Sequence, residues 1–220
     1  MNLASILENR DVEKRVAVTP EIAKKYINLG FNLLLEKNYG EHLGFSDEEY
    51  KGLGVNFSDN YKEIINNSAI LVQLGLPNED RLALFNENHT LIGTLNSFLN
   101  KDILDKLKSK KVNCFSLELL PRITRAQSMD ILSSQANLAG YKAVVEAFQV
   151  YEKAIPMMMT AAGTIPAAKV LVVGAGVAGL QAIATAKRMG AVVFSTDVRM
   201  ASKEQVESLG GKFLTVEGSE

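Results

Sequence analysis

Residues 169–197 read KVLVVGAGVAGLQAIATAKRMGAVVFSTD, and this stretch decides the fold of the C-terminal part of the chain. It opens with the apolar run VLVV, which is typical of a buried strand. Gly174, Gly176 and Gly179 follow in the spacing G-x-G-x-x-G, and a run long enough for a helix comes next. A second apolar run, AVVFST, ends at Asp197. This order of elements predicts a parallel β-α-β unit with a glycine-rich first turn.

Each feature of that turn has a mechanical reason to be there. Gly174 permits a tight turn, Gly176 lets a pyrophosphate approach the backbone, and Gly179 allows the helix to pack closely on the strand. A carboxylate at Asp197 is placed to accept hydrogen bonds from an adenosine ribose and to repel a 2′-phosphate, which favours NAD over NADP. The predicted cofactor-binding residues are Gly174, Ala175, Gly176, Val177, Ala178, Gly179, Asp197 and Val198.

Two alternatives remain open at this point. A glycine-rich turn that only packs would show the same spacing of glycines. Arg199, just beyond Asp197, is either a solvated loop residue or a cation able to attract a phosphate.

The composition is that of an ordinary soluble globular protein. The chain has 220 residues, of which 47% are hydrophobic and 22% charged, and its net charge is −1. Without a basic excess, nucleic acid is not an expected partner. The single cysteine, Cys114, lies in an apolar run that predicts a buried strand and fits a reducing compartment. We expect no secretory signal, and the apolar stretch 154–186 is too interrupted by glycine and proline to span a bilayer.

Apolar runs alternate with helical patterns through residue 118. The expected strands are 2–8, 31–36, 69–74, 90–95 and 112–118, and the expected helices begin after Thr19, Ser46, Asn60, Asn78 and Asn100. Such alternation predicts a mostly parallel sheet with helices on both faces. The expected fold class is therefore α/β, with two Rossmann-like doubly wound sheets joined by a long helix at 137–153. The expected domains are 1–136, a linking segment 137–165, in which Met157–Met159 serve packing, and an NAD-binding region 166–220.

The stretch RITRAQSMDILSSQ, residues 122–135, is unusually polar for a segment that follows an apolar strand. Thr124 and Gln127 have the spacing of a helix N-cap and its third residue, which predicts a helix over 125–134. Gln127, Asp130 and Ser133 would then share one face, with Arg122 just before it. Such donors and acceptors suit a nicotinamide carboxamide. A cap, an ion pair and surface serines would give the same pattern.

Three segments closely resemble the NAD(H)-binding alpha component of proton-translocating NAD(P) transhydrogenases. They are RITRAQSMDILSSQANLAGYKAV, MMMTAAGTIPAAKVLVVGAGVAGLQAIATAKRMGAVV and STDVRMASKEQVESLGGKF, and the N-terminal ENRDVEKRVAVTPE extends the likeness over essentially the whole chain. The resemblance implies that Arg122, Gln127 and Asp130 position the nicotinamide end of NADH, with Ser133 close by. It also implies that the glycine turn binds the pyrophosphate and Asp197 the ribose.

The resemblance further implies an activity and a set of partners. NADH on this component would pass hydride directly to NADP⁺ on a partner component, while a membrane-spanning component moves protons. No acid–base residue and no metal is then required here. The expected state is a homodimer, located in the cytoplasm at the inner face of the cytoplasmic membrane.

Alanine dehydrogenase is a related family and the nearest alternative. Its reaction uses a lysine after the strand resembling AILVQL and a histidine after the one resembling TLIGTL. Here these positions read QLGLP (73–77) and TLNSFLN (94–100), with Asn96 or Ser97 in place of a histidine. Arg15 alone resembles a substrate-binding residue of that family. A non-catalytic NAD sensor is the other alternative.

The second sheet is expected to be incomplete. A dinucleotide-binding domain usually has about six strands. Only 47 residues run from Gly174 to the end of the sequence, enough for the first half of such a domain. We therefore expect these 220 residues to be a fragment of a longer chain.

Overall fold

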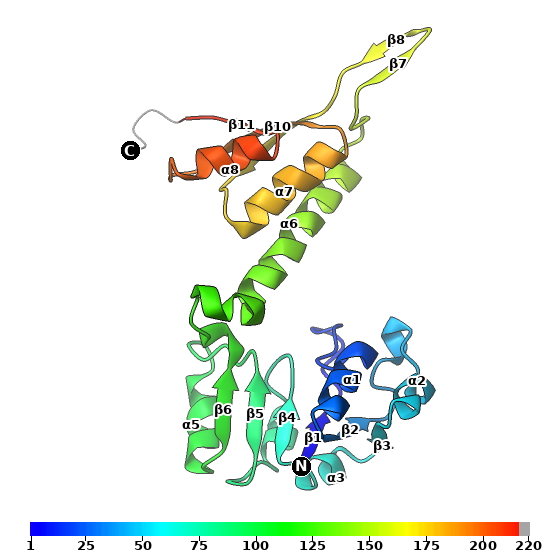
Figure 1. Cartoon of the computed structure of the whole chain (residues 1–220), viewed down its shortest axis with the longest axis vertical. Coiled ribbons are helices and arrows are strands. Elements are labelled where there is room, and N and C mark those ends of the chain that lie inside the picture. The colour runs from blue at the N-terminus through cyan, green and yellow to red at the C-terminus, as the bar shows by residue number, and fades with distance from the viewer. Residues whose placement is uncertain (216–220) are drawn as a thin grey trace. The chain divides into compact units, whose positions relative to one another are not determined.

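The computed structural model describes residues 1–215, which form two compact units that divide between Met129 and Asp130. Each unit is an α/β structure with its own parallel sheet, as the expected fold class requires (Figure 1). None of the helices formed by residues 1–215 is both long enough and apolar enough to cross a membrane.

The first unit is built on a six-stranded parallel sheet with the order β3-β2-β1-β4-β5-β6. Its strands are β1 (Asn2–Ser5), β2 (Asn32–Glu36), β3 (Asn56–Ser58), β4 (Ile70–Val72), β5 (Thr90–Gly93) and β6 (Asn113–Ser116). The chain adds β2 and β3 on one side of β1 and then resumes with β4 on the other. The strand order therefore reverses between β1 and β4, which is where open α/β sheets commonly bind ligands.

Both faces of this sheet are covered. Along β1, Leu3 belongs to one apolar cluster and Ala4 to the other, because successive side chains of a strand point to opposite faces. The helices are α1 (Pro20–Asn28), α2 (Asp47–Gly52), α3 (Tyr61–Asn66), α4 (Glu79–Leu82) and α5 (Lys101–Ser109). The short 3₁₀ segments are η1 (Glu41–Leu43), η2 (Leu117–Leu119) and η3 (Thr124–Met129).

Local capping chemistry explains where the first helices begin. The Thr19 hydroxyl accepts a hydrogen bond from the Ile22 N–H at 3.4 Å, and the Ser46 hydroxyl accepts one from the Glu49 N–H at 3.2 Å. Two expectations need correction. α4 ends at Leu82, although the sequence favours a helix that continues through Phe85. Asn100 is the N-cap residue of α5, but its side chain donates to the Leu95 carbonyl and makes no capping hydrogen bond.

The prediction that 112–118 is a buried strand is wrong in its burial. β6 forms at Asn113–Ser116, but Cys114 and Phe115 are exposed. Among residues 1–215, β6 pairs with β5 only, so it is an edge strand. The apolar composition alone could not distinguish an edge strand from a central one.

The predicted helix 125–134 is also wrong. The chain forms η3 up to Met129, and α6 (Ile131–Val150) then starts, six residues before the expected linking helix. Asp130 is the N-cap of α6, and its carboxylate accepts hydrogen bonds from the Ser133 N–H at 2.9 Å and the Ser133 hydroxyl at 2.8 Å. This cap, rather than Thr124, begins the helix.

The second unit contains the predicted β-α-β arrangement. β9 (Lys169–Val173), α7 (Val177–Arg188), β10 (Val192–Thr196), α8 (Ser202–Ser208) and β11 (Lys212–Phe213) follow one another, and the sheet order is β11-β10-β9. Apolar side chains of α6, α7 and β10 form its core. Among residues 1–215, β9 pairs with β10 only, and Leu171 and Val173 on it are exposed.

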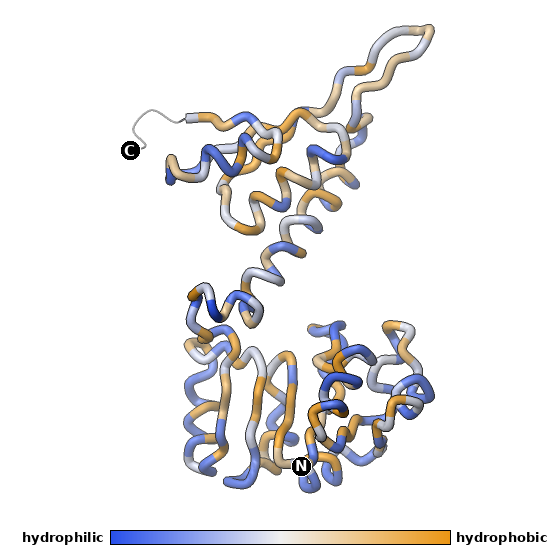
Figure 2. The backbone as a smooth tube through the Cα atoms, viewed as in Figure 1, coloured by the Kyte–Doolittle hydropathy of each residue, from blue (hydrophilic) through white to orange (hydrophobic). Residues whose placement is uncertain are grey.

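Residues expected to form an irregular linker are instead a two-stranded antiparallel hairpin, β7 (Met158–Thr160) and β8 (Gly163–Ile165) (Figure 1). Figure 2 colours this hairpin pale blue, white and orange without deep blue, in agreement with its lack of charged residues. The expectation that Met157–Met159 serve packing is wrong within the described structure. Met157, just before β7, is 59% exposed, and Met158 and Met159 in β7 are 47% and 75% exposed.

Candidate functional site

The glycine turn after β9 has the backbone geometry that its spacing predicts. Gly174 has φ +95°, a conformation that favours glycine, and its N–H donates to the Thr196 carbonyl at 2.8 Å. Gly176 is the N-cap of α7. The turn thus leads directly from the carboxyl end of β9 into a helix N-terminus, where backbone N–H groups and the helix dipole favour an anion.

Gly179 and Gly176 are needed for different reasons. A Cβ on Gly179 would lie 1.8 Å from the Gly174 carbonyl oxygen, so the turn cannot close around any side chain there. A Cβ on Gly176 would meet no atom within 4 Å. The backbone at Gly176 therefore faces open space, as a close approach by a pyrophosphate requires.

Asp197 follows β10 and lies beside the glycine turn. One of its oxygens, Oδ2, accepts a hydrogen bond from the Ala175 N–H at 2.6 Å. The Arg199 side chain binds the same carboxylate, with Nε 3.0 Å from Oδ1 and Nη2 3.1 Å from Oδ2, and the Arg199 N–H donates to Oδ1 at 2.8 Å. The hydrogen bonds from Arg199, and then that from Ala175, hold the pKa of Asp197 well below its usual range. The group is therefore a carboxylate at physiological pH.

The residues predicted for the nicotinamide end fall in both units. Arg122 lies just before η3 and Gln127 within it, in the first unit, and both are exposed. Asp130 and Ser133 open the second unit and are hydrogen-bonded to each other. Asp130 therefore has a structural role as a helix cap, to which any role in cofactor binding would be added.

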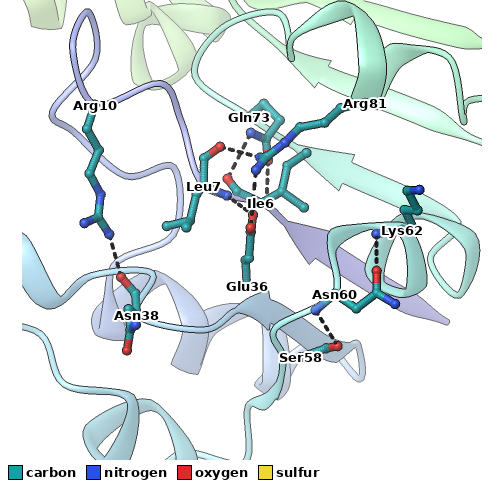
Figure 3. Close-up of polar contacts among 10 residues, drawn as sticks. All are labelled: Ile6, Leu7, Arg10, Glu36, Asn38, Ser58, Asn60, Lys62, Gln73 and Arg81. Carbon is teal, nitrogen blue, oxygen red and sulfur yellow. Dashed lines mark hydrogen bonds and ion pairs between the residues drawn. The ribbon is translucent and has the colours of Figure 1, made fainter.

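A crevice of about 300 Å³ lies at the carboxyl ends of β1 and β4 in the first unit. Glu8 reaches into its wall and accepts hydrogen bonds from the Leu74 N–H at 2.7 Å and from Nε2 of Gln73 at 3.2 Å. Burial raises the pKa of Glu8. Gln73 is itself buried, with Oε1 accepting from the Ile6 N–H at 2.8 Å and Nε2 donating to the Ile6 carbonyl at 3.1 Å (Figure 3).

An ion pair secures the neighbouring loop. Arg81 donates to the Leu7 carbonyl at 2.6 Å and to Glu36 at 3.2 Å, while Glu36 accepts from the Leu7 N–H at 2.7 Å (Figure 3). The polar groups drawn in Figure 3 thus hold backbone in place.

Arg15, Asn96 and Ser97, the positions compared with alanine dehydrogenases in the sequence, have defined surroundings. Arg15 forms a bidentate pair with Glu13, with N–O distances of 2.8 and 2.6 Å. Asn96 has φ +48°, and the Ser97 N–H donates to the Glu118 carboxylate at 3.1 Å. No lysine lines the crevice at β1 and β4 within the described chain.

Sequence reasoning missed two features of these regions. It did not find that Glu118 holds the loop after β5 through the N–H groups of Leu95 and Ser97, because that contact joins residues more than 20 positions apart. It noted Arg199 but not its pairing with Asp197. The Asp-x-Arg spacing was the available signal, since residues two apart at a strand end can bond each other's side chains and backbone.

Comparisons with known proteins agree over the whole chain. The family model for the alanine dehydrogenase/PNT N-terminal domain matches residues 6–139, and the C-terminal domain model matches residues 143–220. An NAD(P) transhydrogenase alpha-subunit protein of Rhodospirillum rubrum is 46% identical over 222 residues, which cover 99% of this chain and 58% of that protein. The chain therefore spans a little over half the length of this relative.

Solved structures give the same picture. The crystal structure of transhydrogenase from Sinorhizobium meliloti superposes with a TM-score of 0.91 at 44% identity, covering 96% of this chain and 64% of that one. An L-alanine dehydrogenase shares the fold, with a TM-score of 0.85 at 20% identity, covering 99% of this chain and 61% of that one.

Proposed function

Because the chain belongs to the alanine dehydrogenase/PNT family, we propose that it is the NAD(H)-binding component of a proton-translocating NAD(P) transhydrogenase. The observation that carries the proposal is the 46% identity to a transhydrogenase alpha subunit, together with a glycine turn that has Asp197 hydrogen-bonded across it. In this role the chain holds NADH for direct hydride transfer to NADP⁺ on a partner component.

The second unit would hold the adenosine half of the cofactor. The N-terminus of α7 receives the pyrophosphate, whose charge is stabilised by the backbone N–H groups of residues 175–179. The ribose lies against Asp197 and Val198. Gly176 leaves room for the pyrophosphate, because nothing lies within 4 Å of where its Cβ would be.

The nicotinamide half would be positioned by Arg122, Gln127, Asp130 and Ser133. A carboxamide offers two N–H donors and one carbonyl acceptor, and these match the acceptor oxygens of Asp130 and the donors of Arg122 and Gln127. Bound NADH supplies the hydride. The residues named here fix the orientation of the ring, which is the main contribution a protein makes to cofactor chemistry.

The proposal includes partners that lie outside this chain. The NADP-binding component docks where the nicotinamide ring is presented, and a membrane-spanning component carries the protons. The chain acts as a homodimer at the inner face of the cytoplasmic membrane. We propose that domain boundaries at about residues 136 and 165 separate the first domain, the link and the NAD-binding region.

Titration with NADH, followed by transhydrogenation assays with an NADP-binding partner component, tests the proposal. Arg122→Ala and Asp130→Ala should leave NADH binding within about threefold of the unchanged chain but slow transhydrogenation by roughly tenfold or more, because misplaced reactants lose rate before affinity. Arg125→Ala removes an exposed arginine from the same segment and is the matched control. If the Arg122 and Asp130 variants behave like the control, the nicotinamide assignment is wrong.

Alanine dehydrogenase is the second candidate, because the fold matches and Arg15 is present. Oxidative deamination needs groups that hold a carboxylate and move protons at the amine carbon. Arg15 is paired with Glu13, and the crevice at β1 and β4 is lined without lysine in the described chain. NADH formation from L-alanine and NAD would favour this reaction. NADH binding without hydride transfer to NADP⁺ in the presence of the partner component would favour a non-catalytic NAD sensor.

A further inference from the structure

The carboxylate of Asp197 has its hydrogen-bonding capacity filled by groups of the protein itself. Its two oxygens accept four hydrogen bonds: from the Ala175 N–H, from the Arg199 N–H, and from Nε and Nη2 of the Arg199 guanidinium. An ionised carboxylate offers about four lone-pair sites. A ribose diol therefore cannot be added to Asp197 unless one or more of these donors leaves.

The four donors differ in how easily they can leave. The two backbone N–H groups are fixed by the glycine turn and by the chain immediately after β10. The guanidinium is the movable pair, because the Arg199 side chain is 62% exposed whereas that of Asp197 is only 6% exposed. Because solvent screens the exposed guanidinium, its ion pair with Asp197 adds little stability and costs little to break.

The geometry of the movable pair matches that of the ligand. The guanidinium presents two N–H donors to the two oxygens, at 3.0 and 3.1 Å, in the side-on arrangement typical of arginine and carboxylate. The 2′- and 3′-hydroxyls of an adenosine ribose also present two neighbouring donors. The two ribose hydroxyls can therefore replace the two guanidinium N–H groups, and the Asp197 carboxylate accepts the same number of hydrogen bonds before and after.

Resting on the proposed function, we propose that Arg199 limits the preference for NADH over NADPH by competing with the adenosine ribose for Asp197. Its guanidinium occupies the diol-binding side of the carboxylate and gives way when a ribose binds. Once displaced, the guanidinium remains within reach of the 2′ position, because Arg199 is only two residues from Asp197. It then attracts a 2′-phosphate that Asp197 alone would repel. Arg199 thereby weakens NADH binding and narrows the discrimination against NADPH.

This inference predicts that removing a cation will strengthen the binding of an anionic ligand. Arg199→Ala should bind NADH about threefold more tightly and NADPH at least about threefold more weakly, which are effects of the size expected for exposed charge pairs. The ratio of the two dissociation constants should rise about tenfold. Arg199→Lys keeps the charge without the two-pronged donor, so it should tighten NADH binding while retaining most NADPH binding.

The experiment measures dissociation constants for four probes: NADH, NADPH, adenosine 5′-monophosphate and adenosine 2′,5′-bisphosphate. The last two contain only the adenosine half and report on Asp197 without the nicotinamide end or a partner component. Arg188→Ala is the control, because it deletes an equal charge from an exposed residue at the last position of α7. It should change the affinities for NADH and NADPH by the same small factor.

A double-mutant cycle with Asp197→Ala separates competition from general electrostatics. In the Asp197→Ala background, adding Arg199→Ala should no longer tighten NADH binding but should still weaken NADPH binding. Competition for Asp197 is excluded if Arg199→Ala weakens NADH binding in the otherwise unchanged chain. It is also excluded if Arg199→Ala still tightens NADH binding when Asp197 is replaced by alanine. A different result is that the unchanged chain binds the adenosine probes, with the Arg199 effects described above, and yet shows no transhydrogenation with an NADP-binding partner component. That result would contradict the proposed function but leave the competition for Asp197 intact. Failure of the chain to bind any of the four probes would overturn both.

Discussion

Gly140 packs against the carbonyl group of Ala178, where α6 crosses the first turn of α7. A Cβ on Gly140 would lie 2.0 Å from the Ala178 oxygen and 2.8 Å from its carbonyl carbon. The neighbouring atoms are all backbone of α7, which cannot rotate away as a flexible side chain could. The helix that links the two sheets in sequence thus directly supports the first turn of the helix that follows the glycine-rich loop.

Replacing Gly140 should therefore destabilise the second unit. Gly140→Ala should lower the free energy of unfolding by about 1–3 kcal/mol, as overpacking typically does, because the two helices must separate. Urea unfolding followed by circular dichroism measures the change. Gly52→Ala is the control, since a Cβ on this helical glycine meets no atom within 4 Å and should be neutral or stabilising by up to about 1 kcal/mol.

Replacing Gly176 and replacing Gly179 should have different effects on stability, although both replacements should weaken cofactor binding. Gly179→Ala should destabilise the chain, because its Cβ would overlap the Gly174 carbonyl oxygen. Gly176→Ala should leave stability nearly unchanged, since its φ is −78° and the space around it is open. Both should weaken NADH binding roughly tenfold or more. At Gly176 a pyrophosphate needs the bare backbone. At Gly179 a side chain prevents the turn that holds the pyrophosphate from closing. Normal NADH binding by Gly176→Ala would contradict the pyrophosphate assignment.

Asp130 should show separable roles as a helix cap and as a cofactor ligand. Asp130→Ala removes the acceptor for the Ser133 N–H and should lower the free energy of unfolding by about 1 kcal/mol. Asp130→Asn keeps an oxygen acceptor at the cap, so stability should change by only a few tenths of a kcal/mol. Thermal unfolding and transhydrogenation rates measure the two effects. A full rate in Asp130→Asn would show that the negative charge has no role in positioning the nicotinamide.

Glu8 should make the first unit less stable as the pH rises. Burial raises its pKa above 4.5 in the folded chain, so the folded state binds a proton more readily than the unfolded state does. This contribution to stability is fully present below the unfolded pKa and is lost as the pH rises through the folded pKa. Glu8→Gln should remove that dependence at and just above pH 4.5 in urea unfolding curves. Glu41→Gln, which removes a carboxylate from an exposed position, is the control for the loss of one negative charge.

Much of the fold was predictable because its signals are local. The caps at Thr19 and Ser46 and the turn at Gly174 each depend on residues within a few positions of one another. Contacts between distant segments could not be read in this way. The burial of Gln73 under the backbone of Ile6, for example, requires β1 and β4 to be neighbours.

In the candidate site, too, the local features were predictable from the sequence and the others were not. The glycine turn and Asp197 were found because a β-α-β unit places them together by its own geometry. The segment 122–135 was misassigned because Thr124 and Asp130 are both acceptable caps, and spacing alone does not say which of them begins the helix. Its role in binding therefore rests on the resemblance and on the experiments above.

The exposed hairpin β7–β8 also has a chemical consequence. Met157, Met158 and Met159 bring three adjacent thioethers to the surface in a segment without charged groups. Peroxide converts exposed thioethers to sulfoxides, which are polar and chiral. Mild oxidation would therefore turn this apolar projection of the chain into a hydrophilic one, and any surface that depends on the hairpin's apolar character would be lost until a reductase restored it.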